Sequence, residues 1–238
     1  MSEWDAQMSD RSLVVIPALN EEASIAQVVK EVREALTDAH IVVVDDGSTD
    51  RTGELARAAG ADVISLPFNI GVGGALRAGF RFAQRFGYQT VVQVDGDGQH
   101  DPTEVPRLFA ALEGVDIVIG ARFAGAGDYA VKGARKLAIG LLARSLSKRT
   151  GVKLTDTTSG FRAFNRHAVD VFARDYPAEY LGDTIEALLI ASKAQLRVAQ
   201  VPVHMRPRSG GTPSHQRIKS AIYLGRVLLA LAISPLRR

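Results

Sequence analysis

Short apolar runs alternate with segments of helical periodicity along the first half of the chain. Runs of strand type are predicted at residues 13–17, 41–44, 62–66, 90–94 and 116–119. Between them, apolar residues recur at the spacing of one helix face, as at Ile25, Val28, Val29 and Val32. This alternation predicts repeated βαβ units. Because the runs are continuously apolar, we expect an α/β fold whose mostly parallel sheet is covered by helices on both faces.

The alternation ends after residue 122. A glycine-rich stretch at 124–133 precedes a predicted helix at 134–149, a loop around Asp156, a helix at 183–193, a strand at 196–203 and a final helix from about residue 216. We therefore divide the chain into a flexible N-terminus (1–10), one α/β domain (11–214) and a C-terminal amphipathic helix (215–238).

The C-terminal segment is apolar but too short to span a bilayer. Arg226 and Pro235 interrupt the stretch 220–236, which falls short of the roughly 20 apolar residues that a spanning helix needs. Its basic residues fall near one stripe of a helix, opposite Leu224 and Leu228, as in helices that lie in the lipid interface. The alternative is a terminal helix packed on the core.

Composition limits the chemistry that the chain can carry. Of its 238 residues, 46% are hydrophobic, 23% are charged and none is cysteine. Disulfides, thiolate metal sites and a cysteine nucleophile are therefore excluded, and any metal must be held by oxygen or imidazole. The N-terminus lacks the basic start and apolar stretch of a secretory signal, which predicts a cytoplasmic protein.

Basic residues accumulate toward the C-terminus. The net charge is +3, yet residues 206–238 contain seven arginines and lysines and no acidic residue. This asymmetry predicts an anionic partner. The segment has a single aromatic residue, Tyr223, whereas readers of single-stranded nucleic acid interleave stacking aromatics. An anionic lipid surface or a substrate phosphate fits better than nucleic acid.

Two carboxylates follow the fourth apolar run. Asp95 and Asp97 are separated by Gly96 and followed by Gln99 and His100. In open parallel sheets, ligands bind beyond the carboxyl ends of the strands, and carboxylate oxygens there suit Mg²⁺ or Mn²⁺. The alternative is a solvated turn before the next helix. His100 is open to both roles, as a metal ligand or as a residue at the helix entry.

The first two runs also end in polar residues. Asp46 lies where a carboxylate can accept a hydrogen bond from a base or a ribose hydroxyl. Ser48 and Asp50 are interpreted as caps of the following helix, and Asn20 as the cap of the helix after the first run. A pocket wall for a nucleoside is predicted from the neighbours of Asn20, namely Pro17, Leu19 and Glu21.

Taken together, these motifs resemble the family 2 inverting glycosyltransferases of the GT-A (Rossmann-like) fold, and within them the polyprenyl-phosphate sugar transferases of the dolichyl-phosphate mannose synthase type. The resemblance spans nearly the whole chain. It is carried by Pro17-x-Leu19-Asn20-Glu21, Asp45-Asp46-Gly47-Ser48-x-Asp50, Asn69-x-Gly71-x-Gly73-Gly74-Ala75, Asp95-x-Asp97-x-Gln99-His100, Gly120-x-Arg122, Asp156-x-x-Ser159-Gly160-Phe161-Arg162 and Arg206-x-Arg208-x-Gly210-Gly211-x-Pro213-Ser214.

The resemblance implies a donor site. Asp95, Asp97 and Gln99 would meet the diphosphate of a nucleotide sugar and its Mg²⁺ or Mn²⁺, with Asp95, Asp97 and Arg208 as the catalytic residues. Arg208, with Arg206 close by, would reach the diphosphate. The residues that would bind the donor nucleotide are Pro17, Leu19, Glu21, Val44, Asp46, Asp95, Gly96, Arg206 and Arg208.

On the acceptor side, the resemblance implies that Arg122 and Arg135 bind a lipid phosphate, with Ser159 beside them. Arginine suits this role because its planar fork binds phosphate oxygens bidentately. Four residues after Arg135, where some relatives have a phosphate-binding serine, this chain has Ile139.

The sequence therefore predicts a metal-dependent hexosyltransferase that moves mannose or glucose from a GDP- or UDP-sugar to polyprenyl phosphate. We expect it to attach peripherally to the inner face of the cell membrane. One alternative is a soluble glycosyltransferase with a small-molecule or glycan hydroxyl acceptor, which would need a base such as Asp183 or Glu186. The other is a noncatalytic module that binds nucleotide sugars.

Overall fold

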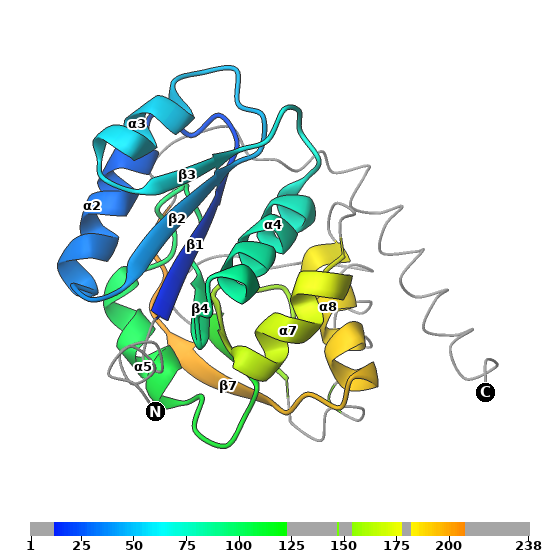
Figure 1. Cartoon of the computed structure of the whole chain (residues 1–238). Coiled ribbons are helices and arrows are strands. Elements are labelled where there is room, and N and C mark those ends of the chain that lie inside the picture. The colour runs from blue at the N-terminus through cyan, green and yellow to red at the C-terminus, as the bar shows by residue number, and fades with distance from the viewer. Residues whose placement is uncertain (1–11, 123–146, 148–153, 178–181, 208–238) are drawn as a thin grey trace, which may run out of the picture.

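The computed structural model describes residues 12–122, 147, 154–177 and 182–207, and within them a mixed sheet forms the middle layer (Figure 1). Its strands lie in the order β3-β2-β1-β4-β6-β5-β7. Their bounds are β1 Ser12–Ala18, β2 His40–Asp45, β3 Asp62–Ser65, β4 Thr90–Gln93, β5 Ile117–Arg122, β6 Arg162–Asn165 and β7 Val198–Val203.

The sheet is mostly parallel, as predicted. β1 pairs in parallel with β2 and β4, β2 pairs with β3, and β5 pairs with β7. β6 is antiparallel to both of its neighbours, β4 and β5. This strand joins two parallel groups into one sheet.

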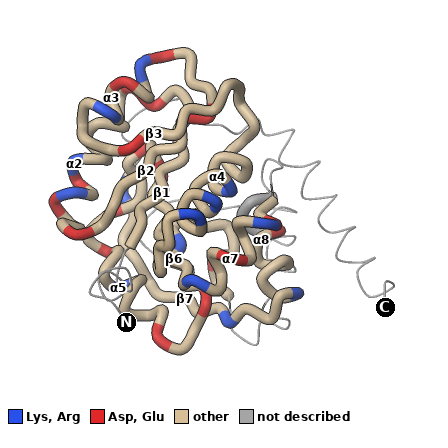
Figure 2. The backbone as a smooth tube through the Cα atoms, viewed as in Figure 1, with Lys and Arg blue, Asp and Glu red and all other residues tan. Residues whose placement is uncertain are grey.

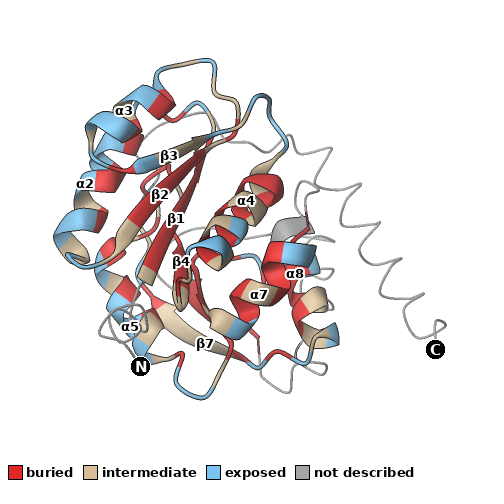
Figure 3. Ribbon diagram, in the orientation of Figure 1, coloured by how far each residue is buried: buried red, intermediate tan, exposed pale blue. Residues whose placement is uncertain are grey.

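Helices cover both faces of the sheet, as the continuously apolar runs predicted (Figures 1 and 3). α2, α3 and α5 pack on one face against alternate strand residues such as Val14 and Ile16, and α4, α7 and α8 pack on the other against Leu13 and Val15. This is the period of two expected for a strand buried on both sides. The helix bounds are α2 Ile25–Ala35, α3 Thr52–Ala58, α4 Val72–Arg85, α5 Val105–Ala110, α7 Arg166–Asp175 and α8 Gly182–Lys193, with a short 3₁₀ turn η1 at Pro102–Glu104.

The predicted strands and the helix at 183–193 are confirmed with shifts of a few residues at their ends. β6 and α7 were missed by the sequence prediction. The polar residue Asn165 marks the boundary between them, since its side chain accepts a hydrogen bond from Ala168 N and so caps α7. The helices predicted at 134–149 and 215–238 lie outside the described residues, except for residue 147. No helix in the described part of the chain is long and apolar enough to cross a bilayer.

α4 approaches β1 more closely than a side chain would allow. A Cβ atom at Gly79 would lie 2.4 Å from Cγ1 of Val15, and Val15 is 1% exposed. Because the surrounding core is closely packed, neither partner has room to retreat. Glycine at this position brings α4 against the strand whose end enters the site.

Gly79→Ala is expected to lower the free energy of unfolding by about 1–3 kcal/mol, the usual cost of overpacking a core. A Val15→Ala background removes the clash. Gly79→Ala should then be neutral or stabilising, because alanine has a higher helix propensity than glycine. Urea unfolding of the two single variants and the double variant measures this coupling. An equal cost in both backgrounds would show that the contact with Val15 is not responsible.

Candidate functional site

The ends of three adjacent strands converge at one edge of the sheet. In the register of the sheet, Pro17 on β1 lies beside Val44 on β2, and Val15 lies beside Gln93 on β4. β1 and β4 carry no charged residue, and β2 carries Asp45 at its last position, so charge begins where the strands end (Figure 2). The motifs that follow these strands therefore face one shared site, as the parallel topology predicted.

Asp46, just beyond β2, organises the loop before α4. It is 3% exposed, and its carboxylate accepts hydrogen bonds from Ile70 N at 2.8 Å and Gly71 N at 2.9 Å. Burial raises the pKa of Asp46, while the two backbone N–H groups act in the opposite direction. Gly47 completes this contact: its φ is 74°, and a Cβ there would lie 2.7 Å from the Phe68 carbonyl carbon. The structure thus gives Asp46 a role in building the wall of the site.

Glu21 and Gly96 are joined through Ser24. The Ser24 hydroxyl donates to the Gly96 carbonyl at 2.8 Å and lies 3.2 Å from a carboxylate oxygen of Glu21. Glu21 is 9% exposed, and Leu19 is partly exposed between it and the buried Pro17. These contacts bring the ends of β1 and β4 together. Four of the predicted donor residues therefore lie at one edge, namely Pro17, Leu19, Glu21 and Gly96.

The loops after β1 and β2 are cross-linked by side chains that the sequence predicted to be helix caps. Asn20 does not cap α2, which begins at Ile25; instead its φ is 55° and its side-chain oxygen accepts from Thr49 N at 2.9 Å. Ser48 also does not cap its helix, because its hydroxyl accepts from Asn20 N at 3.0 Å. The N-cap of α3 is Arg51, so Asp50 lies one residue before the cap, although its carboxylate accepts from Thr52 N, the first residue of α3, at 2.9 Å.

Asp95 and Asp97 follow β4, and neighbouring N–H groups orient both carboxylates. An Asp95 oxygen accepts from Gln93 Nε2 at 3.0 Å, and an Asp97 oxygen accepts from Gln99 N at 3.0 Å. Asp95 is 35% exposed and Asp97 is 8% exposed. A Cβ at Gly160 would lie 2.9 Å from Gln93 Nε2 and 3.4 Å from an Asp95 oxygen, so a larger residue would crowd this support.

His100 lies behind Asp95. Its Nδ1 accepts from Asp95 N at 3.0 Å, so a neutral ring carries its proton on Nε2, which lies 3.5 Å from an Asp95 carboxylate oxygen. The ring is 4% exposed and stacks on Phe161, with 4.7 Å between the ring centroids. Of the two roles open from the sequence, the structure favours the one at the entry to η1, where His100 also orients Asp95.

The oxygen groups at this edge fit a divalent cation that is shared with a substrate. Within the described residues, no group of three or more His, Cys, Asp or Glu side chains is arranged to hold a metal alone. Mg²⁺ commonly binds to one or two carboxylates and completes its shell with phosphate oxygens and water. Asp95 and Asp97 match that limited donor set.

The acceptor-side prediction centres on Arg122, the last residue of β5. Its guanidinium pairs bidentately with Asp156, with Nε–Oδ2 2.8 Å and Nη2–Oδ1 3.1 Å, and Nη2 also donates to the Thr158 hydroxyl at 2.9 Å. Burial acts to raise the pKa of Asp156, but the pairing with Arg122 outweighs it and holds that pKa below its usual value. Ser159 is 2% exposed, and its hydroxyl accepts from Phe161 N. Arg135 lies outside the described residues.

Asp156 is a candidate functional residue that sequence reasoning did not assign, although it begins the quoted motif Asp156-x-x-Ser159. The signal available was an acidic residue in a loop next to a glycine-containing turn. Its partner Arg122 lies 34 positions away, so the pairing could not be read locally. The ion pair fixes the direction of the Arg122 side chain at the edge of the site.

Asp156→Asn is expected to lower the free energy of unfolding at pH 7 by about 1 kcal/mol, because the pair is only partly screened by solvent. Since the folded-state pKa of Asp156 is lowered, this stabilisation is present above the carboxyl's ordinary pKa and is lost as the pH falls through the folded-state value. Urea unfolding of both proteins should show a difference in the free energy of unfolding that is constant from pH 7 down to the ordinary carboxyl pKa. The difference should then shrink as the pH falls further. A pH-independent difference would contradict the assignment, and Asp175→Asn serves as an exposed control.

Two predicted donor residues occupy different surroundings from those expected. Val44 is 0% exposed in the core, so its side chain could meet a nucleoside only after a rearrangement. Arg206 pairs with Glu31 and Asp101 through opposite ends of its guanidinium. Arg208 lies outside the described residues.

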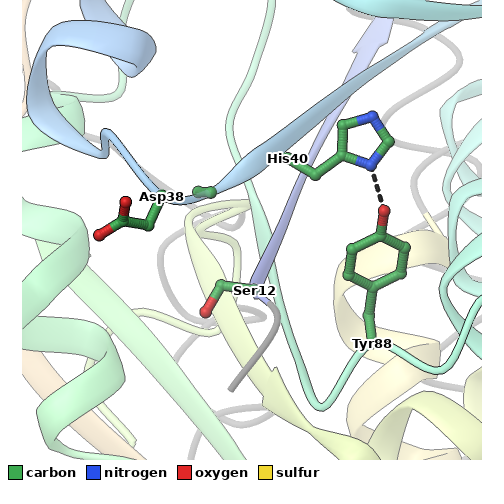
Figure 4. Close-up of a pocket in the computed structure, with 5 residues that line it drawn as sticks. Ser12, Asp38, His40 and Tyr88 are labelled. Carbon is green, nitrogen blue, oxygen red and sulfur yellow. Dashed lines mark hydrogen bonds between the residues drawn. The ribbon is translucent and has the colours of Figure 1, made fainter. Parts of the chain in front are cut away.

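A hollow of about 320 Å³ lies at the opposite edge of the sheet (Figure 4). Ser12, Asp38, Ala39, His40 and Tyr88 line it, and Nδ1 of His40 is hydrogen-bonded to the Tyr88 hydroxyl. These residues stand at the amino ends of the strands. None of the predicted site residues lines this hollow, so it is separate from the strand-end site.

Comparison with known proteins identifies the family to which the chain is similar. Residues 13–172 match the model of glycosyl transferase family 2. The chain is 38% identical over 170 residues to a polyprenol monophosphomannose synthase of Mycolicibacterium smegmatis, covering 68% of this chain and 64% of that protein. It is 32% identical over 211 residues to an undecaprenyl-phosphate mannosyltransferase of Micrococcus luteus, covering 84% of this chain and 86% of that protein.

Solved structures resemble the fold over most of the chain. A glucosyl-3-phosphoglycerate synthase of Mycobacterium tuberculosis, in complex with phosphoglyceric acid, superposes with a TM-score of 0.72 at 27% identity, covering 97% of this chain and 81% of that one. The same synthase in complex with Mn²⁺, uridine diphosphate and phosphoglyceric acid gives a TM-score of 0.70 at 26% identity, with coverages of 97% and 80%.

Proposed function

The chain belongs to glycosyl transferase family 2, and from that premise we propose that it transfers mannose or glucose from a GDP- or UDP-sugar to polyprenyl phosphate. The observation that carries the proposal is the placement of Asp95 and Asp97 directly beyond β4, beside the ends of β1 and β2. Two of the relatives described above act, by their names, on polyprenol or undecaprenyl phosphate. These names support the acceptor class.

In the proposed site, the two carboxylates hold Mg²⁺ or Mn²⁺ against the donor diphosphate. When bound, such an ion neutralises the negative charge that builds on the leaving diphosphate. The wall formed by Glu21, Leu19 and the loop held by Asp46 would orient the nucleoside. A complex of a structural neighbour with Mn²⁺ and uridine diphosphate supports the choice of ion and of nucleotide class.

The proposed reaction breaks the bond between the anomeric carbon and the diphosphate oxygen, with the electron pair leaving on the nucleoside diphosphate. An oxygen of the acceptor phosphate forms the new bond to that carbon. Because a phosphate monoester is largely ionised at neutral pH, it needs no strong general base. Arg122, whose direction is fixed by its pairing with Asp156, would orient this phosphate.

A second candidate acceptor is a small soluble molecule that carries a phosphate and reacts through a hydroxyl group. The structural neighbours bound to phosphoglyceric acid favour this alternative. A hydroxyl acceptor would require a general base, and Glu186, exposed on α8, is the described candidate. Arg122 could bind the phosphate in either case.

Transfer assays distinguish the two acceptors. Purified protein with Mn²⁺ and radiolabelled GDP-mannose or UDP-glucose would be given polyprenyl phosphate or 3-phosphoglycerate in parallel. Label in butanol-extractable lipid is the expected result. Label confined to the water-soluble product would replace the lipid acceptor by the soluble one. Donor binding without transfer to either acceptor would leave a noncatalytic nucleotide-sugar module.

Membrane association is part of the same proposal. We propose that the basic, apolar segment predicted as an amphipathic helix at 215–238 attaches the protein peripherally to the anionic inner face of the cell membrane. Co-sedimentation with vesicles that contain phosphatidylglycerol should exceed that with neutral vesicles. It should also weaken with added salt, because screening reduces attraction to anionic lipid. Equal binding to both vesicle types would contradict this attachment.

A further inference from the structure

The segment that follows β7 returns to the loop that carries Asp95 and Asp97. Met205 forms an antiparallel bridge with His100, and Arg206 N donates to the Gln99 carbonyl at 2.9 Å. His204 N also donates to a Glu104 carboxylate oxygen at 3.3 Å. Three consecutive residues therefore run alongside the end of the Asp95–Asp97 loop and η1.

The Arg206 side chain fastens this segment to two further elements. Its Nη1 lies 2.5 Å from a Glu31 carboxylate oxygen on α2, and its Nη2 lies 2.9 Å from an Asp101 oxygen before η1. The side chains of Arg206, Glu31 and Asp101 are 39%, 27% and 19% exposed. Because guanidinium is a rigid, planar fork with several donors, Arg206 can donate to both carboxylates from opposite ends of the group.

The backbone link continues from Arg206 to a predicted metal ligand. Gln99 accepts from Arg206 N through its carbonyl, while its own N–H donates to Asp97 Oδ1 at 3.0 Å. Both hydrogen-bonding groups of the Gln99 backbone are thus engaged. Holding Arg206 in place therefore holds the turn that orients the Asp97 carboxylate.

We propose that Arg206 is a positioning residue that sets the geometry of the Asp97 turn through its clamp on Glu31 and Asp101, and that it does not itself bind the donor diphosphate. The proposal rests on the proposed function, since it assigns Asp97 to the donor site. It revises the expectation that Arg206 reaches the diphosphate. Both ends of the guanidinium are already occupied by carboxylates, and moving it to a diphosphate would leave Glu31 without this partner.

The proposal makes Glu31, a residue of α2 outside the predicted donor set, matter for donor binding. Removing a group that supports a metal ligand typically weakens metal affinity by about 10- to 100-fold. Glu31→Ala and Arg206→Ala are each expected to weaken binding of Mn²⁺ with GDP or UDP by about 10-fold. The double variant should bind Mn²⁺ with GDP or UDP no more weakly than Arg206→Ala alone does, because both changes break the same clamp.

Isothermal titration with the Mn²⁺ complexes of GDP and UDP measures this coupling. Glu34→Ala is the matched control, since Glu34 lies on the same helix, is 65% exposed and makes an ion pair with Lys30 at 3.9 Å. Wild-type affinity for Glu34→Ala is expected. If Arg206 bound the diphosphate directly, Glu31→Ala would leave affinity unchanged or raise it while Arg206→Ala lowered it. That pattern would overturn the proposal.

Hydrogen exchange separates failure of the clamp from failure of the proposed function. Glu31→Ala should speed exchange of the Arg206 amide, which donates to Gln99, while Glu34→Ala should not. A wild-type protein that binds neither nucleotide would refute the proposed function, and exchange would still test the clamp. Unchanged exchange of the Arg206 amide in Glu31→Ala would refute the clamp even in a protein that binds donor normally.

Discussion

Asp97→Ala is expected to lower kcat/KM for sugar transfer by about 10²- to 10³-fold, the usual cost of removing a group that stabilises charge in the transition state. Asp97 is 8% exposed and its carboxylate is oriented by Gln99 N, so it is already in place before substrate binds. In the proposed site it helps to hold the ion that neutralises the leaving diphosphate. Alanine removes that ligand without adding bulk.

The measurement is steady-state transfer of labelled sugar at saturating Mn²⁺, with unfolding by urea as a check on folding. Asp97→Asn keeps the shape but loses the negative charge, so it should be nearly as impaired as Asp97→Ala. Asp175→Asn, an exposed aspartate at the end of α7, should retain wild-type activity. A folded Asp97→Ala protein with activity within about threefold of wild type would remove Asp97 from the catalytic machinery.

Much of the fold could be predicted from the sequence because its first half follows simple rules. The buried strands β1, β2 and β4 are short apolar runs, and α2 and α4 show one apolar face. β6 could not be found in this way. It is four residues long and contains Arg162, a charged side chain that is 1% exposed. In the hydrophobic pattern of the sequence, a buried arginine cannot be distinguished from a polar loop residue, because the pattern does not show its hydrogen-bond partners.

The location of the site was predictable, but several side-chain roles were not. Topology alone places the residues after β1, β2 and β4 at one edge, and the structure brings Glu21, Gly96 and Asp46 there. The capping role predicted for Asn20 was wrong, and the ion pairs of Arg206 were not foreseen, because the partners of both residues lie far along the chain. Asn20 bonds across 29 positions to Thr49, and Arg206 bonds across 175 positions to Glu31. The preference of asparagine for helix caps, or of arginine for phosphate, gives no information on partners so far away in the sequence.

The proposed acceptor side shows how the fold and the site depend on the same residue. Arg162 on β6 lies between Gln93 on β4 and Ile119 on β5 in the register of the sheet. Its guanidinium donates to the Ser159 carbonyl at 2.9 Å and to the Thr157 carbonyl at 3.1 Å. The segment that it holds connects Asp156, the partner of Arg122, to the strand beside Asp95. Arg162 therefore stabilises both the sheet and the loop on the acceptor side.

Arg162→Met is expected to lower the free energy of unfolding by about 3 kcal/mol, because each buried carbonyl left without its donor costs about 1–3 kcal/mol. Methionine roughly preserves the length of the side chain, so the loss reports hydrogen bonds more than a cavity. The midpoint of urea unfolding measures the loss. Arg166→Met is the matched control: Arg166 pairs with Asp170 at 34% and 39% exposure, and such a pair contributes about 1 kcal/mol or less.

Arg162→Met also tests whether the buried Arg162 side chain positions the loop on the acceptor side. If Arg162 positions the loop that begins at Asp156, Arg162→Met should raise the KM for the acceptor several-fold more than the KM for the donor, at a temperature where the protein remains folded. Equal changes in both constants would indicate a general loosening of the sheet. An unchanged free energy of unfolding would contradict the buried hydrogen bonds themselves, since two carbonyls cannot lose charged donors in a closely packed interior without cost.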